Sequence, residues 1–111
     1  MENDRINKLL QFLKEDPNDA FTLYALATEY KKEDKQKALE YFEKLLNEHE
    51  NYVGTYYHAA ALYDELEKED EAKITYQKGI QIARNLNNMH AFSELQGAYN
   101  KFMGLDYEDE V

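Results

Sequence analysis

The feature that most constrains the fold of this chain is an internal repeat. In the first half of the repeat, a bulky residue is followed by apolar or small residues three and four places later and by a tyrosine seven places later. In the second half, an alanine is followed by an aromatic residue four places later. The pattern appears first as Leu23, Leu26, Ala27, Tyr30, Ala38 and Phe42, and again as Tyr56, Ala59, Ala60, Tyr63, Ala72 and Tyr76. Such a period indicates a helical repeat. Because one helix pair cannot bury its apolar side alone, several pairs must stack, and the stack offers a surface suited to holding another protein.

The composition favours long helices joined by tight turns. Only four glycines and one proline occur in 111 residues, and residues with good helix propensity dominate. Apolar residues at helical spacing then predict an all-α chain with about six helices. We expect these helices at residues 3–14, 19–32, 36–49, 52–66, 68–86 and 88–102.

Length and charge narrow the classes of protein further. A chain of 111 residues suits one compact domain, expected over residues 1–104, followed by a mobile acidic tail over 105–111. The formal net charge of -10 disfavours nucleic acid and anionic membranes as partners and favours a basic or neutral one. No apolar stretch approaches the length of a membrane span. The absence of cysteine fits a reducing compartment, and we expect a cytoplasmic location.

The repeated residues resemble the tetratricopeptide repeat, and the resemblance covers nearly everything from Ile6 to Phe102. It implies a right-handed α-α superhelix of antiparallel helix hairpins, with two full repeats, a preceding half repeat and a C-terminal capping helix. The segment Asp16-Pro17-Asn18 is similar to the family's turn between repeats, where proline ends one helix and Asn or Asp can cap the next. Leu45 departs from the pattern because a small residue is usual there.

In this family the first helix of each pair lines the concave groove, so the resemblance implies partner-binding residues on these helices. Carried over residue by residue, they are Phe21, Tyr24, Thr28 and Lys31, then Gly54, Tyr57, Ala61 and Asp64, and finally His90, Ser93, Gly97 and Asn100. Tyr24 and Tyr57 are the candidate anchors, because exposed aromatic side chains are favoured at protein interfaces. In the alternative, Phe21 and Tyr24 pack against the first helix and Tyr57 closes the gap beside Gly54.

Some members of the family clamp the terminal carboxylate of a chaperone tail with lysine, asparagine and arginine. The corresponding places in this chain hold Tyr24, Thr28, His58, His90 and Glu94, which supply no fixed cationic fork. We therefore do not expect a chaperone-tail adaptor.

Catalytic, metal and cofactor sites are not expected. The three histidines are far apart and form no paired ligand motif, and there is no Gly-rich phosphate loop or nucleophile elbow. A meeting of His58 with His90 across the groove, as a proton-sensitive element, remains an alternative to solvated or packed histidines.

Three hypotheses about function remain. The first is a scaffold that binds a peptide or helix of a partner protein in the groove, with acidic residues favouring a basic partner. The second is a structural protein that self-associates through exposed ends, at least as a weak homodimer, with Ile6, Leu10 and Phe102 at the interface. The third, a small-molecule pocket or enzyme, has no motif behind it.

Overall fold

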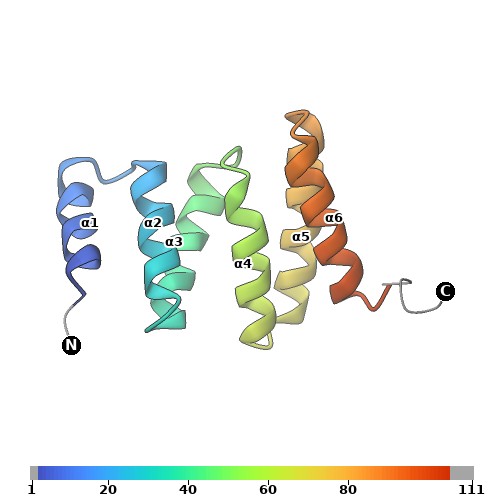
Figure 1. Cartoon of the computed structure of the whole chain (residues 1–111), viewed down its shortest axis with the longest axis horizontal. Helices are drawn as coiled ribbons and strands as arrows, with labels where there is room; N and C mark the ends of the chain where they lie inside the picture. The colour runs from blue at the N-terminus through green and yellow to red at the C-terminus, as the bar shows by residue number, and fades with distance from the viewer. Residues whose placement is uncertain (1–2, 106–111) are drawn as a thin grey trace. The chain divides into compact units, whose positions relative to one another are not determined.

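The computed structural model describes residues 3–105, which form helices and short turns with no strand among them. The helices are α1 (Asp4–Glu15), α2 (Ala20–Tyr30), α3 (Lys35–Glu48), α4 (Gly54–Glu65), α5 (Glu69–Asn85) and α6 (Met89–Phe102) (Figure 1). The predicted all-α class with six helices is therefore confirmed. The fourth helix begins later than expected, because Tyr52 belongs to a turn in which its carbonyl accepts the Thr55 N–H at 3.1 Å.

The chain divides into two compact units, residues 1–55 and 56–111. The first contains α1, α2 and α3, and the second contains nearly all of α4 together with α5 and α6. The expected single domain over 1–104 stays a prediction. The predicted acidic tail lies, apart from Leu105, outside the described residues.

Side-chain caps explain where most of the helices begin. At each of four helix starts, an Asn or Asp oxygen accepts the backbone N–H of the residue three places on, which satisfies one of the unpaired donors of the first turn. The pairs are Asn3 with Ile6, Asp19 with Thr22, Asp34 with Lys37 and Asn88 with Ala91. The cap of α2 is thus Asp19, rather than Asp16 or Asn18 of the preceding turn.

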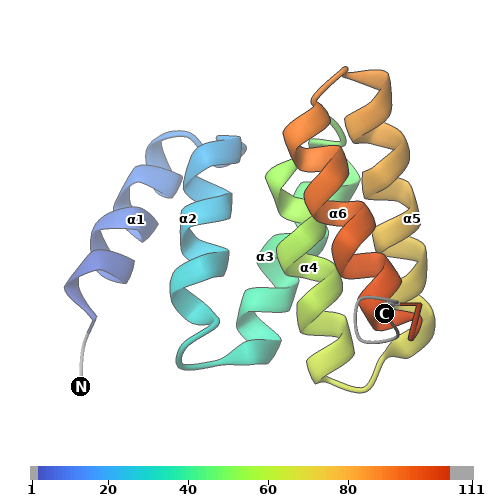
Figure 2. The ribbon, with the colours of Figure 1, turned by 45° about the vertical axis from the view of Figure 1, so that its right-hand side comes forward.

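In the first unit, α2 packs against both α1 and α3 (Figure 2). Ile6 and Leu9 of α1 are buried against Leu26 of α2. The rings of Tyr30 and Tyr41 stack at a centroid distance of 5.7 Å, which joins the end of α2 to α3. The fully buried apolar residues here are Leu23, Leu26, Ala27, Ala38, Phe42 and Leu45. Most of them are positions of the repeat pattern, so the stripe expected from the sequence forms the core.

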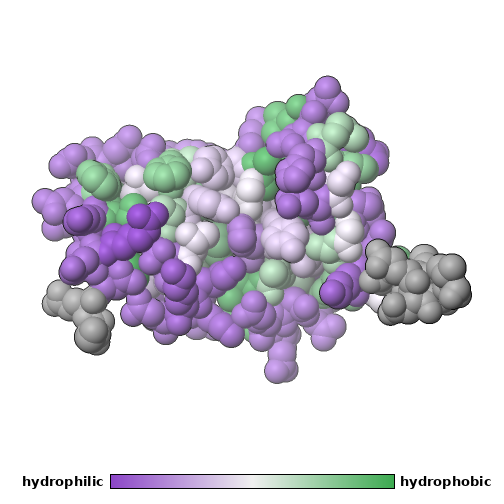
Figure 3. Space-filling view, in the orientation of Figure 1, coloured by the Kyte–Doolittle hydropathy of each residue, from purple (hydrophilic) through white to green (hydrophobic). Residues whose placement is uncertain are grey.

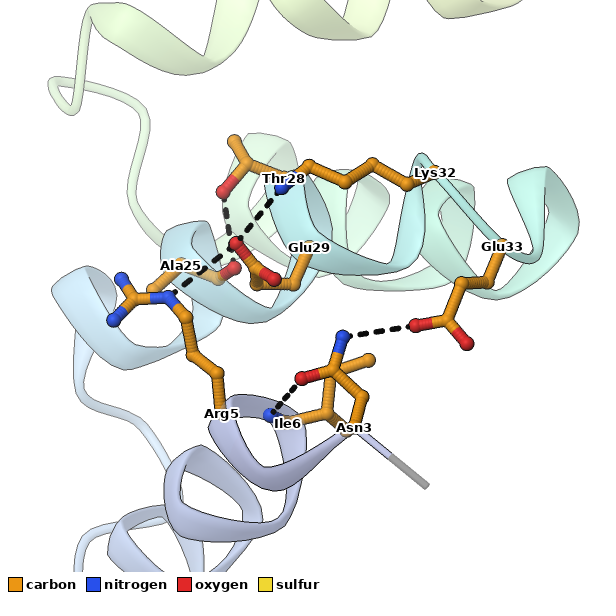
Figure 4. A network of polar contacts seen from close by, with 8 residues as sticks. All are labelled: Asn3, Arg5, Ile6, Ala25, Thr28, Glu29, Lys32 and Glu33. Carbon is orange, nitrogen blue, oxygen red and sulfur yellow. Dashed lines mark hydrogen bonds and ion pairs between the residues drawn. The ribbon is translucent and has the colours of Figure 1, made fainter. Parts of the chain in front are cut away.

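Beside this core, polar contacts join α1 to α2 and to the turn after α2 (Figure 4). Arg5 Nε of α1 lies 3.3 Å from Glu29 Oε2 of α2, and Lys32 Nζ lies 3.4 Å from the same oxygen. The Asn3 side chain, whose oxygen caps α1, also donates a 2.9 Å hydrogen bond to Glu33 Oε2. The start of α1 is therefore attached to the C-terminal part of α2 and to the turn that follows it, by polar as well as apolar contacts.

In the second unit, α5 lies beside α6 (Figure 2). Gly79 of α5 faces Tyr56 of α4 and Leu95 of α6. The buried apolar residues are Tyr56, Ala59, Ala60, Leu62, Tyr63, Ala72, Tyr76, Ile82, Ala83 and Leu95. Tyrosines thus supply much of the bulk of this core.

On the face drawn in Figure 3 the surface is mostly hydrophilic, with hydrophobic side chains gathered over parts of α1 and α2 and near the start of α6. None of the helices within residues 3–105 combines the length and apolar character that crossing a membrane requires.

Candidate functional site

The first unit presents the predicted binding residues of α2, which begins directly after its cap Asp19. Phe21 lies in the first turn and is 61% exposed as a residue. Tyr24 lies one turn further on and is half-buried, with its ring centroid 5.4 Å from that of Tyr52. Residues three apart on a helix lie on the same side. Phe21 and Tyr24 therefore form one aromatic surface on α2.

Beside Tyr24 the first unit contains an open cavity of about 400 Å³. It is lined by Tyr24, Asn51, Tyr52, Val53 and Gly54. Burial, and to a smaller extent the neighbouring Tyr52, raise the pKa of the Tyr24 hydroxyl above its usual value. Tyr24 is therefore a neutral phenol at physiological pH, able to donate or accept a hydrogen bond at the wall of this cavity.

The alternative in which these aromatic residues serve only packing is wrong for Phe21, because its side chain remains exposed to solvent. The space beside Gly54 is occupied by Tyr24, whose ring atoms lie 3.7 Å from where a side chain at position 54 would begin. Tyr24 therefore has the role beside Gly54 that the alternative gave to Tyr57.

Thr28 and Lys31 complete the residues predicted on this side of α2. The Thr28 hydroxyl donates a 3.0 Å hydrogen bond to the Ala25 carbonyl (Figure 4), so its donor is already used within the helix. Lys31 is half-buried and forms the C-cap of α2.

The second unit contains a cavity of about 460 Å³ between α4, α5 and α6. We call it the second-unit cavity. It is lined by Tyr57 and Asp64 of α4, Glu69 and Tyr76 of α5, and Ala98, Lys101 and Phe102 of α6. Its volume lies in the range of roughly 300–1,000 Å³ typical of ligand pockets.

Tyr76 is the centre of an aromatic group at this cavity. Its ring centroid lies 5.5 Å from Phe102 and 6.2 Å from Tyr99, both on α6. The Tyr99 hydroxyl accepts a 3.1 Å hydrogen bond from Gln77 Nε2, which fixes that ring against α5. Burial, followed by the negative charge of Asp64 and the neighbouring Tyr57, raises the pKa of the Tyr76 hydroxyl. Tyr76 is therefore a neutral hydrogen-bonding group close to a carboxylate.

Comparison with known proteins places this geometry in a family. Residues 53–86 match the sequence profile of the tetratricopeptide repeat. A solution structure of a tetratricopeptide repeat domain protein from Salinibacter ruber is 46% identical, with a TM-score of 0.76, and the match covers 84% of this chain and 95% of that one. The chain belongs to the tetratricopeptide-repeat family.

Two further structures support the fold. A crystal structure of the Salinibacter ruber tetratricopeptide repeat domain protein matches at 46% identity and a TM-score of 0.74, covering 80% of this chain and 100% of that one. The crystal structure of MamA matches in fold at 21% identity and a TM-score of 0.66, covering 97% of this chain and 70% of that one. No curated protein matches the chain. The predicted family and its helical-solenoid fold class are thus confirmed, and this fold generally mediates protein-protein interaction.

Within the tetratricopeptide repeat, the structure brings only some of the predicted residues of the second unit together. Tyr57 and Asp64 line the second-unit cavity, and Tyr57 is 41% exposed. Ala61 is half-buried on the same helix and does not line it. His90 and Ser93 are exposed in the first part of α6, away from the lining residues of that helix.

The histidines do not form the pair that the sequence left open. His90 Nε2 lies 3.6 Å from Glu94 Oε2, one turn along α6. The ring of His58 meets the ring of Tyr57 edge-on, with centroids 5.6 Å apart. Among the residues that the structure describes, no group of three or more His, Asp or Glu side chains could hold a metal ion.

Sequence reasoning missed five residues of the second-unit cavity: Glu69, Tyr76, Ala98, Lys101 and Phe102. The repeat pattern placed Tyr76 among the packing residues, and its ring does pack against Phe102 as well as lining the cavity. The sequence carries no signal for the combination, because three separate helices contribute to the walls.

The structure corrects one of the three residues expected at a self-association interface, Ile6. Ile6 is only 6% exposed, because it packs on Ala25 and Leu26 within its own unit. Leu10 is half-buried against the same cluster, and Phe102 is half-buried against Tyr76. Ile6 is therefore a core residue, and the other two already have apolar partners.

Proposed function

We propose that this tetratricopeptide-repeat protein binds a peptide or helix of a partner protein through the first helices of its repeats. The observation that carries the proposal is the exposure of Phe21 on α2 and Tyr57 on α4. On the same helices, Leu23 and Tyr56 are buried, so the fold has core positions for bulky apolar residues and does not use them for Phe21 and Tyr57.

The exposure of these rings has a free-energy cost in the unbound protein. Burying a large apolar side chain is worth about 1.5–3 kcal/mol relative to leaving it in water. A partner that covers Phe21 or Tyr57 would recover part of that free energy, as aromatic residues do at the centres of protein interfaces. Tyr57 also lines the second-unit cavity, and Tyr24 lines the cavity of the first unit, so each unit has a space that could receive a partner side chain. Phe21, Tyr24 and Tyr57 are therefore the proposed anchors.

The surrounding residues have supporting roles in the proposal. Thr28 and Lys31 complete the proposed contact residues of the first unit, and Ala61, Asp64, His90 and Ser93 complete those of the second. The formal net charge of -10 would attract a basic partner over distances longer than direct contacts. The proposed partner is accordingly a basic peptide or helix, and a cytoplasmic location for this encounter is part of the proposal.

The test is selection of binders from a displayed library of random peptides, followed by affinity measurements on variants. Phe21→Ala, Tyr24→Ala and Tyr57→Ala should each weaken the selected peptides by about tenfold or more, the effect of losing an interface anchor. Phe12→Ala is the matched control, because Phe12 on α1 is 56% exposed but lies outside the proposed surface. Circular dichroism must show unchanged helicity in every variant.

Two outcomes would overturn the proposal: unchanged affinity in all three anchor variants, or an equal loss in Phe12→Ala. Self-association stays a separate hypothesis with its own measurement. Light scattering that gives the monomer mass of 13.2 kDa at every concentration would remove it.

A further inference from the structure

The walls of the second-unit cavity are rich in aromatic side chains. Tyr57 comes from α4, Tyr76 from α5 and Phe102 from α6, and the last two rings lie 5.5 Å apart. The faces of aromatic rings attract cations through their quadrupole, most strongly where water is partly excluded. Three helices thus contribute rings to one partly enclosed space.

The charged groups of the cavity have an excess of negative charge. Asp64 and Glu69 contribute two carboxylates, and Lys101 contributes one ammonium group. Within residues 3–105 no ion pair joins any of these three side chains to a partner. Ionised carboxylates accept several hydrogen bonds each. The acceptors of this cavity are therefore available to a donor from outside.

A further hydrogen-bonding group lies at the same place. Tyr76 is 94% buried as a residue, and its side chain lines the cavity. Within the described part of the chain no hydrogen bond engages its hydroxyl. Burial, followed by the negative charge of the nearby Asp64, raises the pKa of this phenol and so disfavours its ionisation. The cavity thus combines aromatic faces, unpaired carboxylates and a neutral hydroxyl.

We propose that the second-unit cavity binds a guanidinium group, the side chain of an arginine on the partner peptide. This inference rests on the proposed function and names the chemistry of one contact. A planar guanidinium stacks on aromatic rings, has five N–H donors and is more weakly hydrated than the ammonium group of lysine. Arginine therefore suits a cavity with aromatic walls better than lysine does. The positive charge of Lys101 lowers the affinity of the cavity for arginine by repulsion.

The test uses the whole protein labelled with ¹⁵N and a small probe, Nα-acetyl-arginine amide, in an NMR titration. The probe should shift the amide signals of Tyr57, Asp64, Tyr76 and Lys101 in a saturable way. Nα-acetyl-citrulline amide has nearly the same shape without the charge and should leave these signals in place. Nα-acetyl-lysine amide should bind more weakly than the arginine probe.

Variants then separate a specific pocket from general attraction to an acidic protein. Asp64→Asn and Glu69→Gln should each weaken the arginine probe by about threefold or more, the effect of losing one solvent-accessible ion pair. Tyr57→Leu keeps an apolar side chain but removes the ring, and should also weaken binding. Lys101→Gln should strengthen it. Asp70→Asn is the matched control, since Asp70 has the same charge in the first turn of α5 and does not line the cavity.

The inference is overturned if the citrulline probe shifts the same signals, if the lysine probe binds as tightly as the arginine probe, or if Asp70→Asn weakens binding as much as Asp64→Asn. These outcomes are independent of the peptide selection. If the selected peptides contain no arginine but their affinity still depends on Phe21, the proposed function stands and this inference is overturned. A specific arginine titration, together with selected peptides whose affinity is unchanged in all three anchor variants, would overturn the proposed function and leave guanidinium binding at this cavity intact.

Discussion

Gly79 shows how one position can determine the packing of a helix pair. A side-chain carbon added there would lie 2.5 Å from Tyr56 Cβ and 2.9 Å from Tyr56 Cγ, closer than such atoms normally approach. Tyr56 Cβ is bonded directly to the backbone of α4, so no change of side-chain rotamer can move it away. The missing side chain is therefore what allows α5 to approach α4 so closely.

We expect Gly79→Ala to destabilise the protein by about 1–3 kcal/mol, the usual cost of overpacking a core, even though alanine gains about 1 kcal/mol in helix propensity. Gly97→Ala is the control, because nothing lies within 4 Å of the added carbon. It should stabilise the protein by up to about 1 kcal/mol. The measurement is the free energy of unfolding in urea. A stabilised Gly79→Ala variant would show that α4 and α5 can separate without loss.

Asp19 predicts a pH dependence of stability. The Thr22 hydroxyl donates a 2.7 Å hydrogen bond to Asp19 Oδ2, and the Thr22 backbone N–H donates another at 2.9 Å. These bonds hold the pKa of the Asp19 carboxyl below its usual value. Because the folded pKa is the lower one, the contribution to stability is present above the unfolded pKa and is lost as pH falls through the folded pKa.

The stability difference between the native protein and Asp19→Ala should therefore be largest near neutral pH and shrink as the solution is acidified. Chemical denaturation at a series of pH values measures it. Thr22→Val removes the hydroxyl donor at similar volume and should reduce the pH dependence. A difference that stays constant down to pH values below the usual range of carboxyl groups would refute this assignment.

At the level of helices, three of the six end in the same kind of turn, which the spacing of residues in the sequence does not predict. The helices α4, α5 and α6 are each followed by a residue with positive φ: Glu67 at 61°, Asn87 at 57° and Gly104 at 74°. In each case the next residue's N–H donates to a carbonyl five places back, as Lys68 does to Tyr63 at 2.8 Å. This is the Schellman motif, in which glycine is the usual residue and asparagine is tolerated.

Glu67 is the unfavourable member of this set. A non-glycine residue in the left-handed region costs about 1–2 kcal/mol, and glutamate lacks the short side chain that helps asparagine there. We expect Glu67→Gly to raise the free energy of unfolding by roughly 1 kcal/mol, and Asn87→Gly to change it less. Thermal and urea unfolding of both variants check this. An equal effect at both positions would mean that the side chain of residue 67 does not strain the turn.

Across the chain, charge is the property with the clearest consequence for binding. The formal net charge of -10 should accelerate association with a basic peptide, and salt should remove this effect because the screening length falls from about 30 Å at 0.01 M to about 3 Å at 1 M. We expect the association rate constant of a basic selected peptide to fall by about tenfold or more over this range. Stopped-flow fluorescence measures it.

A neutral peptide bound by the same surface serves as the control and should show little change in association rate. Equal salt dependence for the basic and neutral peptides would contradict electrostatic steering. In that case the acidic residues would serve solubility alone.

The all-α class, the six helices and the family follow from the sequence because they depend on local spacing. Leu23, Leu26 and Ala27 recur at helical intervals, and the structure buries all three. The exposed aromatic residues Phe21 and Tyr57 could also be placed, because the repeat assigns them to positions outside the packing stripe. The use of either ring in binding remains a proposal.

Only the tertiary structure decided which side chains share a cavity. The spacing of residues along one helix states which face a side chain lies on, but the walls of the second-unit cavity come from three helices, and their meeting depends on how closely those helices pack. Gly79 permits the close packing of these helices. As a result, Tyr76 and Phe102 pack against each other and also line the cavity. Periodicity along the chain therefore determined the repeat, while contacts between helices determined the candidate site.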